Sequence, residues 1–318
     1  MNRMIEVEGL TKRYGRFLAL DHISFAASQG EIVGFLGPNG AGKTTTMRIL
    51  TGYMPPTSGR ARVAGFDVLE DSLAVRQHVG YLPETVRLYR EMTVRGYLKF
   101  LGQLRQVEHL RTRIDEVLEL VGLRERAGHL IRSLSKGMQQ RLGLAQAILH
   151  DPPVLILDEP TIGLDPHQVQ DLRRLIRQLG QTHTILLSTH ILSEAEQLCD
   201  RVIIIDRGRI VAENTPDNLR DSLSRRSRLY VRVGKAPPGV DVVRVLSAVR
   251  GVTAVEPTAD GYLLSTRPND DVRPAVAAAI VAVGLPLLEM RPWAVTLEEI
   301  FLELTVSLDA PREGRHHA

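Results

Sequence analysis

Short apolar runs, separated by glycines and polar residues, dominate the first two thirds of the chain. The runs EIVGFL (31–36), VLILDE (154–159) and TILLST (184–189) have the length and apolar character of strands buried in a sheet. Residues 5–31 instead alternate between apolar and polar positions, which predicts antiparallel strands around a turn. Between about 86 and 150, apolar residues recur at helical spacing. The pattern therefore predicts an α/β core with an antiparallel β part and a helical subdomain.

A second pattern follows after a pair of short predicted strands and a proline-started helix in 201–219. Its segments predict strand, helix, strand, strand, helix and strand, the split βαβ or ferredoxin-like order. They are RLYVRV, VVRVLSAVR, VTAVEP, GYLLST, DDVRPAVAAAIVAVG and PLLEMRP, and TLEEIFLELT (296–305) predicts a closing amphipathic helix. We therefore divide the chain into a first domain at 1–222, a small α+β domain at 225–308 and a polar tail at 309–318.

Composition places the chain among ordinary globular proteins. It has 318 residues, of which 43% are hydrophobic and 24% are charged, a length that suits one large domain or two of ordinary size and is enough to bury a core. The first residues, MNRMIEVEGL, are polar and lack the apolar segment of a secretory signal. The longest apolar run, 274–288, is shorter than the ~20 residues of a membrane span. With a single cysteine, Cys199, no intrachain disulfide can form, so we expect a cytoplasmic protein. The one local cluster of basic residues, in DSLSRRSRLY (221–230), lies at the expected domain joint and is interpreted as a solvated linker, so we expect no nucleic acid partner.

A glycine-rich loop follows the first apolar run. The sequence GPNGAGKT fits GxxxxGK[ST] and is followed by a predicted helix, the strand–loop–helix context of a P-loop NTPase core. The residues expected to bind the nucleotide are Gly37, Pro38, Asn39, Gly40, Ala41, Gly42, Lys43, Thr44 and Thr45. The glycines allow backbone N–H groups to point inward at phosphates, and the helix N-terminus adds positive charge. Lys43 is placed for the β- and γ-phosphates, Thr44 for Mg²⁺ and Thr45 for the α-phosphate.

Two carboxylates end the apolar run at 154–159. Acids at the end of a buried strand are costly unless they meet a cation or water. Asp158 is suited to the Mg²⁺ shell, and Glu159 to a general base that activates the attacking water. Taken alone, the pair could also be two solvated acids at a strand end, but the phosphate loop upstream favours the catalytic interpretation.

The segment before that run carries the most specific signal. LSKGMQQR (Leu134–Arg141) resembles the signature motif of ABC ATPases, usually LSGGQ followed by QR. The order of P-loop, signature and LILDEP resembles that of an ABC nucleotide-binding domain. In that family the signature binds the γ-phosphate held by the opposite subunit, which assigns this contact to Ser135, Lys136, Gly137, Met138 and Gln139. Lys136 and Met138 depart from the usual Gly and Gln, which puts the efficiency of the site in question.

The resemblance assigns roles to three further residues. Tyr14 is at the position of the aromatic residue that stacks on adenine. Asp165, in GLDP, is at the position of the D-loop residue at the subunit contact. His190, after TILLST, is at the position of the switch histidine that contacts the γ-phosphate, and Lys43, Glu159 and His190 would be catalytic.

Glu84, in VGYLPE, is at the position where the family usually has glutamine. A carboxylate is a better Mg²⁺ ligand than an amide oxygen, but it lacks the NH₂ donor. Glu84 is therefore interpreted as a catalytic and metal-binding residue beside Thr44 and Asp158. The alternative is a solvated acid in a surface loop.

The resemblance implies an ATP-binding and hydrolysing subunit that uses ATP and Mg²⁺. Its expected partners are a separate integral-membrane permease and a second nucleotide-binding subunit, in a homodimer or heterodimer peripheral to the inner face of the cell membrane. The added C-terminal domain favours export over import. Two alternatives are weighed: an ABC ATPase acting on ribosomes or DNA, and an inactive regulatory module. Single-domain length and the lack of heptads disfavour the first, and the presence of Lys43, Asp158, Glu159 and His190 disfavours the second. The sequence does not identify the substrate.

Overall fold

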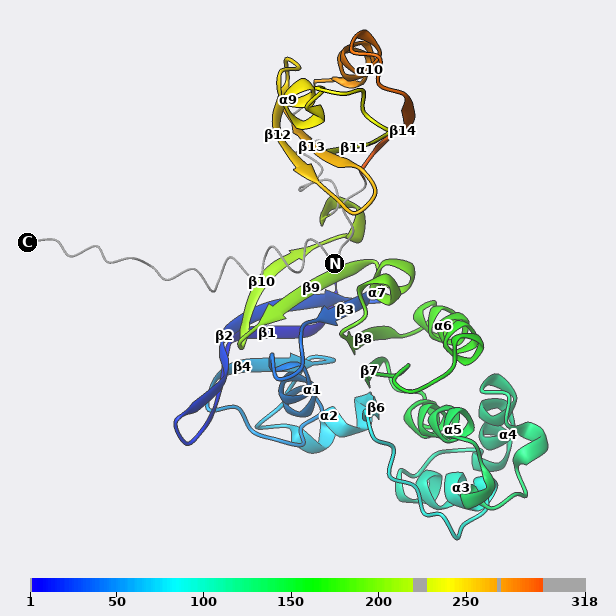
Figure 1. Cartoon of the computed structure of the whole chain (residues 1–318). Coiled ribbons are helices and arrows are strands. Elements are labelled where there is room, and N and C mark those ends of the chain that lie inside the picture. Colours follow the sequence, from blue (N-terminus) through cyan, green and yellow to red (C-terminus); the bar gives the residue numbers. More distant parts are fainter. Residues whose placement is uncertain (1, 220–227, 268–269, 294–318) are drawn as a thin grey trace, which may run out of the picture. The chain divides into compact units, whose positions relative to one another are not determined.

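The computed structural model describes residues 2–219, 228–267 and 270–293 (Figure 1). The chain divides into two compact units, Met1–Pro216 and Asp217–Ala318, which are described separately. The sequence analysis put the end of the first domain at 222. The predicted closing helix at 296–305 and the tail at 309–318 lie outside the described residues.

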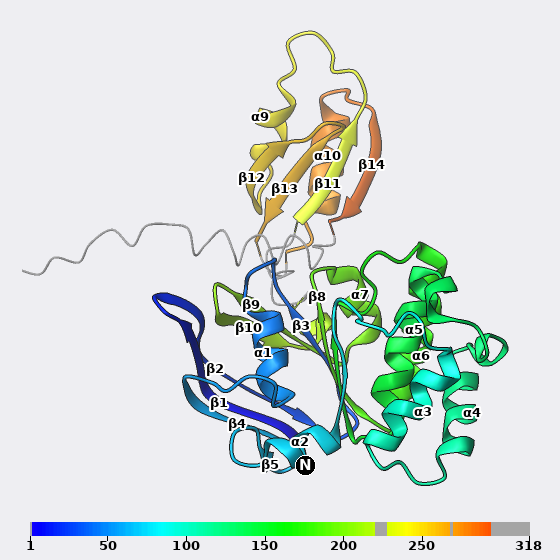
Figure 2. The same cartoon turned by 90° about the horizontal axis from the view of Figure 1, so that it is seen from below.

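A six-stranded sheet in the order β10-β9-β3-β8-β7-β6 forms the centre of the first unit (Figures 1 and 2). Its strands are β3 (Ile32–Leu36), β6 (Val79–Leu82), β7 (Val154–Asp158), β8 (Thr184–Thr189), β9 (Arg201–Asp206) and β10 (Arg209–Asn214). All neighbours pair in parallel except β9 and β10, which form a hairpin. Every residue of β3, β7 and β8 is buried, as expected for strands covered on both faces. The three buried strands predicted from the apolar runs are confirmed.

A second, antiparallel sheet in the order β2-β1-β4-β5 shares a core with the first. Its strands are β1 (Arg3–Tyr14), β2 (Phe17–Ser28), β4 (Ser58–Val63) and β5 (Phe66–Asp67). Phe25 of β2 packs against Phe35 of β3 with ring centroids 5.3 Å apart. Buried Ile5, Leu10 and Met47 belong to the same cluster, so burial of apolar area fixes the two sheets to each other. The predicted antiparallel part is confirmed.

The helices of the first unit lie around the parallel sheet and in a separate group (Figures 1 and 2). They are α1 (Lys43–Leu50), α2 (Ser72–His78), α3 (Val94–Leu104), α4 (Leu110–Leu120), α5 (Lys136–Ile148), α6 (Pro166–Gly180) and α7 (Leu192–Leu198). α3, α4 and α5 pack on one another, which confirms the helical character predicted for 86–150. Thr93 caps α3 by accepting from the Gly96 N–H, and Ser135 caps α5 in the same way.

In the second unit, the described residues 228–267 and 270–293 form an antiparallel sheet and two helices. Its elements are β11 (Arg228–Val233), α9 (Val242–Ser247), β12 (Val252–Pro257), β13 (Tyr262–Thr266), α10 (Arg273–Ala282) and β14 (Leu287–Pro292). The sheet order is β12-β13-β11-β14, and Val231, Leu246, Leu264 and Ile280 are in its core. The β-α-β-β-α-β order agrees with the sequence prediction. None of the helices in the described ranges has the length and apolar character needed to cross a membrane.

Candidate nucleotide-binding site

The loop between β3 and α1 has a backbone that only glycine accommodates easily. Gly40 and Gly42 have φ values of +82° and +112°, in the region that side chains disfavour. A Cβ atom at Gly37 would lie 2.3 Å from the carbonyl oxygen of Ile205. Because α1 begins at Lys43, the unpaired N–H groups of its first turn face the loop. The loop is therefore built to bind an anion such as a phosphate chain.

Lys43 points back over this loop from the start of α1. Its side chain is only 6% exposed, and Nζ donates to the carbonyl oxygens of Gly37 (2.7 Å) and Pro38 (3.2 Å). Nζ also lies 3.3 Å from Oε1 of Glu159, in an ion pair whose carboxylate is 7% exposed. A γ-phosphate that binds Lys43 must therefore compete with Glu159.

Asp158 ends β7 beside the start of α1. Its Oδ1 accepts a 2.6 Å hydrogen bond from the Ser188 hydroxyl, and a hydrogen bond also links it to Thr44. Burial raises the pKa of Asp158, which these two hydrogen bonds partly oppose. Its Oδ2 is buried and has no hydrogen-bond partner, so this oxygen is available to bind a cation. Thr45 follows Thr44 and is also half-buried.

This donor set fits Mg²⁺ better than a metal held by protein alone. Among the residues that the structure describes, no group of three or more His, Cys, Asp or Glu side chains could hold a metal ion. Mg²⁺ usually takes one or two carboxylates and completes its shell with phosphates and water. Asp158, Thr44 and a bound nucleotide can supply such a shell.

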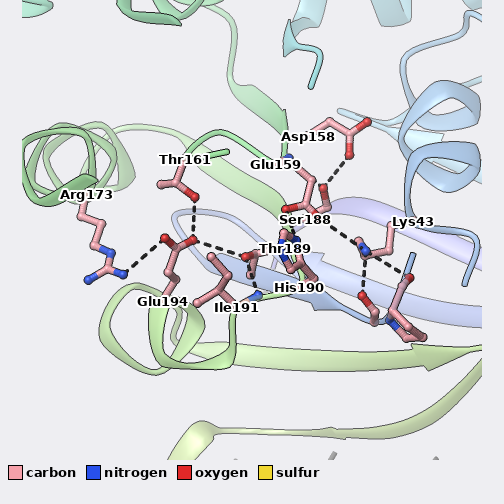
Figure 3. Close-up of polar contacts among 12 residues, drawn as sticks. Lys43, Asp158, Glu159, Thr161, Arg173, Ser188, Thr189, His190, Ile191 and Glu194 are labelled. Carbon is pink, nitrogen blue, oxygen red and sulfur yellow. Dashed lines mark hydrogen bonds and ion pairs between the residues drawn. The ribbon is translucent and has the colours of Figure 1, made fainter. Parts of the chain in front are cut away.

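Glu159 and His190 meet at the end of the sheet (Figure 3). Glu159 has a φ of +47°, which is rare for a residue with a side chain. Its N–H donates to both the hydroxyl (3.0 Å) and the carbonyl oxygen (3.2 Å) of Ser188. His190 Nδ1 lies 2.8 Å from Glu159 Oε2 and donates to it when the carboxylate is ionised, while 41% of the imidazole side chain is exposed. A buried carboxylate is thus held between a lysine and a histidine that reaches solvent.

Four polar residues of this region were missed by the sequence analysis. Ser188 orients Asp158 and Glu159, while Thr161, Thr189 and Glu194 form a second buried cluster beside them. Ser188 and Thr189 were visible as two polar positions ending the apolar run at 184–189. Nothing in the sequence indicated which residues they contact.

Glu84 lies in the loop after β6 and is exposed. It lines a cavity of about 640 Å³ together with Thr44 and Asp158, so the three residues predicted as metal ligands face one space. Burial, together with the Asp158 charge, raises the pKa of the neighbouring Tyr81 to about 12, and the Glu84 charge adds to this effect.

The signature and the D-loop lie side by side in the same chain. Ser135 accepts from the Met138 N–H (3.3 Å), and Gln139 Nε2 donates to the Leu134 carbonyl oxygen. The exposed Lys136 extends over Gly163. A Cβ atom added at Gly163 would lie 1.9 Å from the Nζ atom of Lys136.

Two further contacts complete this region. A Cβ atom at Gly137 would lie 2.2 Å from Oε1 of Gln168, and Asp165 caps α6 by accepting from the Gln168 N–H (3.0 Å). Gln140 Nε2 donates to the carbonyl oxygen of Pro160, next to Glu159. These contacts link the helix that carries the signature to the turn that carries Glu159.

Tyr14 ends β1 with 44% of the residue exposed. Its hydroxyl lies 2.9 Å from the Met54 sulfur, and Lys12 Nζ lies 5.3 Å from its ring centroid. An exposed aromatic face is compatible with stacking on a base.

Comparison with known proteins identifies the family. The model of the ABC transporter family matches residues 20–162. The chain is 42% identical over 233 residues to the bacitracin transport ATP-binding protein BcrA of Bacillus licheniformis, covering 73% of this chain and 74% of that protein. It is 37% identical over 306 residues to the daunorubicin resistance ATP-binding protein DrrA3 of Streptomyces coeruleorubidus, covering 95% of each. The dimeric structure of MJ0796, a bacterial ABC transporter cassette, matches with a TM-score of 0.60 and 26% identity over 67% of this chain and 98% of that one.

The fold and the phosphate loop define an ABC ATPase cassette. The chain belongs to the family of ABC transporter ATP-binding proteins. It is accordingly an ATP-binding subunit and an ATPase.

Proposed function

We propose that this subunit hydrolyses ATP at the edge of the parallel sheet to power export through a separate membrane-spanning permease. The observation that carries the proposal is the meeting of Lys43, Glu159 and His190 within one set of contacts. Lys43 would bind the β- and γ-phosphates, Glu159 would accept the proton of the attacking water, and His190 would contact the γ-phosphate. The 2.8 Å contact with His190 would hold the Glu159 carboxylate in place for that proton.

Mg²⁺ is proposed as the cofactor. Asp158 and Thr44 would hold it, with Glu84 lining the same cavity. When bound, the cation supplies charge neutralisation for the β- and γ-phosphates. The unpaired Oδ2 of Asp158 is the observation that supports this role.

A second nucleotide-binding subunit would complete each ATP site. The first turn of α5, with Ser135 through Gln139, offers N–H groups and a hydroxyl for a γ-phosphate held by the partner copy. Asp165 would lie at the contact between subunits. The dimeric structure of the similar cassette MJ0796 supports this arrangement. Tyr14 would stack on the adenine.

The permease would dock on exposed apolar side chains of the first unit. Tyr89 is 59% exposed and packs edge-on against Phe100, which is 43% exposed. Leu73 and Leu104 are 74% and 72% exposed and line a cavity of about 950 Å³. Clusters of large exposed apolar side chains such as these are typical of protein–protein interfaces. We infer that the chain works in the cytoplasm at the inner face of the cell membrane. The names of the resistance and transport relatives support export of a drug-like compound.

The proposal is tested by steady-state ATP hydrolysis as a function of protein concentration, with Glu159→Gln in parallel. Turnover per chain should rise with concentration, and the variant should bind ATP without hydrolysing it. Turnover that does not depend on concentration would contradict the two-subunit site, and a variant as active as the parent would contradict Glu159 as the base. Copurification with a coexpressed permease, lost after Phe100→Asp but not after Leu69→Asp, an exposed control site, tests the docking surface.

A further inference from the structure

Glu194, on α7, is a buried carboxylate that takes no part in the proposed chemistry. The residue is 4% exposed. Its Oε2 accepts hydrogen bonds from Thr161 Oγ1 (2.7 Å) and Thr189 Oγ1 (3.3 Å), and its Oε1 lies 3.4 Å from a guanidinium nitrogen of Arg173 (Figure 3). A buried charge with donors on both oxygens holds those donors firmly, because releasing any of them leaves a buried charge undersatisfied.

The first of these hydrogen bonds reaches the turn that carries Glu159. Thr161 follows Glu159 by two residues and is itself buried. The turn between them holds Glu159 at a φ of +47°, a conformation that persists only where neighbouring contacts enforce it. Ser188 fixes the N–H of Glu159, and Thr161 anchors the downstream side of the turn to Glu194.

The second hydrogen bond reaches the turn that carries His190. Thr189 precedes His190, and its hydroxyl donates to Glu194 while it accepts from the N–H of Ile191 (3.0 Å). One hydroxyl therefore braces both sides of His190. Glu194 contacts the neighbours of Glu159 and of His190 and touches neither residue itself.

We propose that Glu194 is a positioning residue that clamps the Glu159 turn to the His190 turn, so that the two side chains meet in the geometry needed for hydrolysis. The inference rests on the proposed roles of Glu159 and His190. A displacement of about 1 Å between groups that must act together can cost about 100-fold in rate. The hydrogen bonds and the ion pair of Glu194 given above do not reach the proposed nucleotide-binding loop at 37–45.

The clamp is tested with Thr161→Val and Thr189→Val, which remove one hydroxyl each, and with Glu194→Ala. Each is expected to lower kcat by about 10- to 100-fold. The ATP Kd should not rise, because a displaced Glu159 competes less with the γ-phosphate for Lys43. Combining Glu194→Ala with Thr161→Val should cost little more than either alone, because both break the same link. Glu194→Gln should fall nearer the parent, since an amide oxygen still accepts from both hydroxyls.

Thr184→Val is the matched control. Thr184 is the first residue of β8 and Thr189 the last; both are buried, and both accept a backbone N–H at 3.0 Å, from Gly30 and Ile191. Thr184→Val should lose about as much folding stability as Thr189→Val and keep the parental kcat.

A spectroscopic measurement reports on the clamp independently of turnover. The ¹⁵N resonance of His190, assigned with His190→Ala, should move toward that of a free imidazole in Thr161→Val and Thr189→Val, and should stay in place in Thr184→Val. Parental kcat and an unmoved resonance in both valine variants would overturn the clamp. If Glu159→Gln hydrolyses ATP as the parent does, the proposed function fails, while the resonance still decides whether Glu194 holds the two turns together.

Discussion

Replacing Glu159 with glutamine should slow hydrolysis and, at the same time, tighten ATP binding. The structure predicts the second effect because Lys43 is paired with Glu159, with Nζ and Oε1 3.3 Å apart. A γ-phosphate must replace the carboxylate as the partner of Lys43. Glutamine keeps the size of the side chain and removes the competing charge.

The size of this effect follows from the ion pair. At 3.3 Å, an effective dielectric constant of about 20 gives an attraction of about 5 kcal/mol. Desolvation of the two buried charges offsets most of it, and Lys43 keeps its two carbonyl acceptors in the variant. We take a remaining competition of about 1 kcal/mol, which corresponds to an ATP Kd about fivefold lower. Loss of the general base should reduce kcat by about 10²- to 10⁴-fold.

Equilibrium titration with a fluorescent ATP analogue, followed by single-turnover hydrolysis, measures both quantities. Glu31→Gln serves as the control, because Glu31 is a half-buried carboxylate paired with Arg201 at 2.7 Å and immediately precedes β3, at the end of the strand away from the loop. Weaker ATP binding by Glu159→Gln than by Glu31→Gln would refute the competition. Parental hydrolysis would refute Glu159 as the base.

Three further predictions test other parts of the chain. Glu84→Gln should leave the ATP Kd within about twofold and change kcat, and a collapse of ATP binding in titration would contradict its role at the edge of the cavity. Burial and the Arg105 cation lower the pKa of His150 to about 4, so stability should fall as the pH drops from about 6.5 to 4, by at most about 1.4 kcal/mol per pH unit. In urea unfolding, the free energy of unfolding of His150→Asn should depend less on pH than that of the parent. An unchanged pH dependence would exclude His150 as the cause of the stability loss. Gly37→Ala should abolish ATP binding while the protein stays folded by circular dichroism, because the methyl group would lie 2.3 Å from the Ile205 oxygen; parental affinity would show that the loop can shift.

The elements that the sequence predicted well are those with a strong local signal. β3, β7 and β8 are short apolar runs without polar interruption, and only a sheet covered on both faces buries such runs completely. The conformation of the phosphate loop was also predictable, because Gly40 and Gly42 have positive φ values, which glycine adopts more readily than other residues.

The supporting residues of the site could not be predicted in the same way. Glu194 resembles any other glutamate of an amphipathic helix, and its partners lie 33 and 5 residues away along the chain. A contact between Thr161 and Glu194 depends on how α7 packs beside β8, which is a property of the tertiary structure. Likewise, the positive φ of Glu159 has no local cause, because glutamate has no preference for it.

The end of β8 explains how these contacts form one site. Successive side chains of a strand point to opposite faces of the sheet, so Ser188 and Thr189 cannot serve the same neighbour. Ser188 reaches Asp158 and the N–H of Glu159, while Thr189 reaches Glu194 on α7. His190 follows the strand and contacts the Glu159 carboxylate. A shift of β8 by one residue would exchange the two faces and break both sets of contacts at once. The parallel register that pairs Asp158 with Ser188 is therefore the structural condition for the proposed base, its histidine and the clamp.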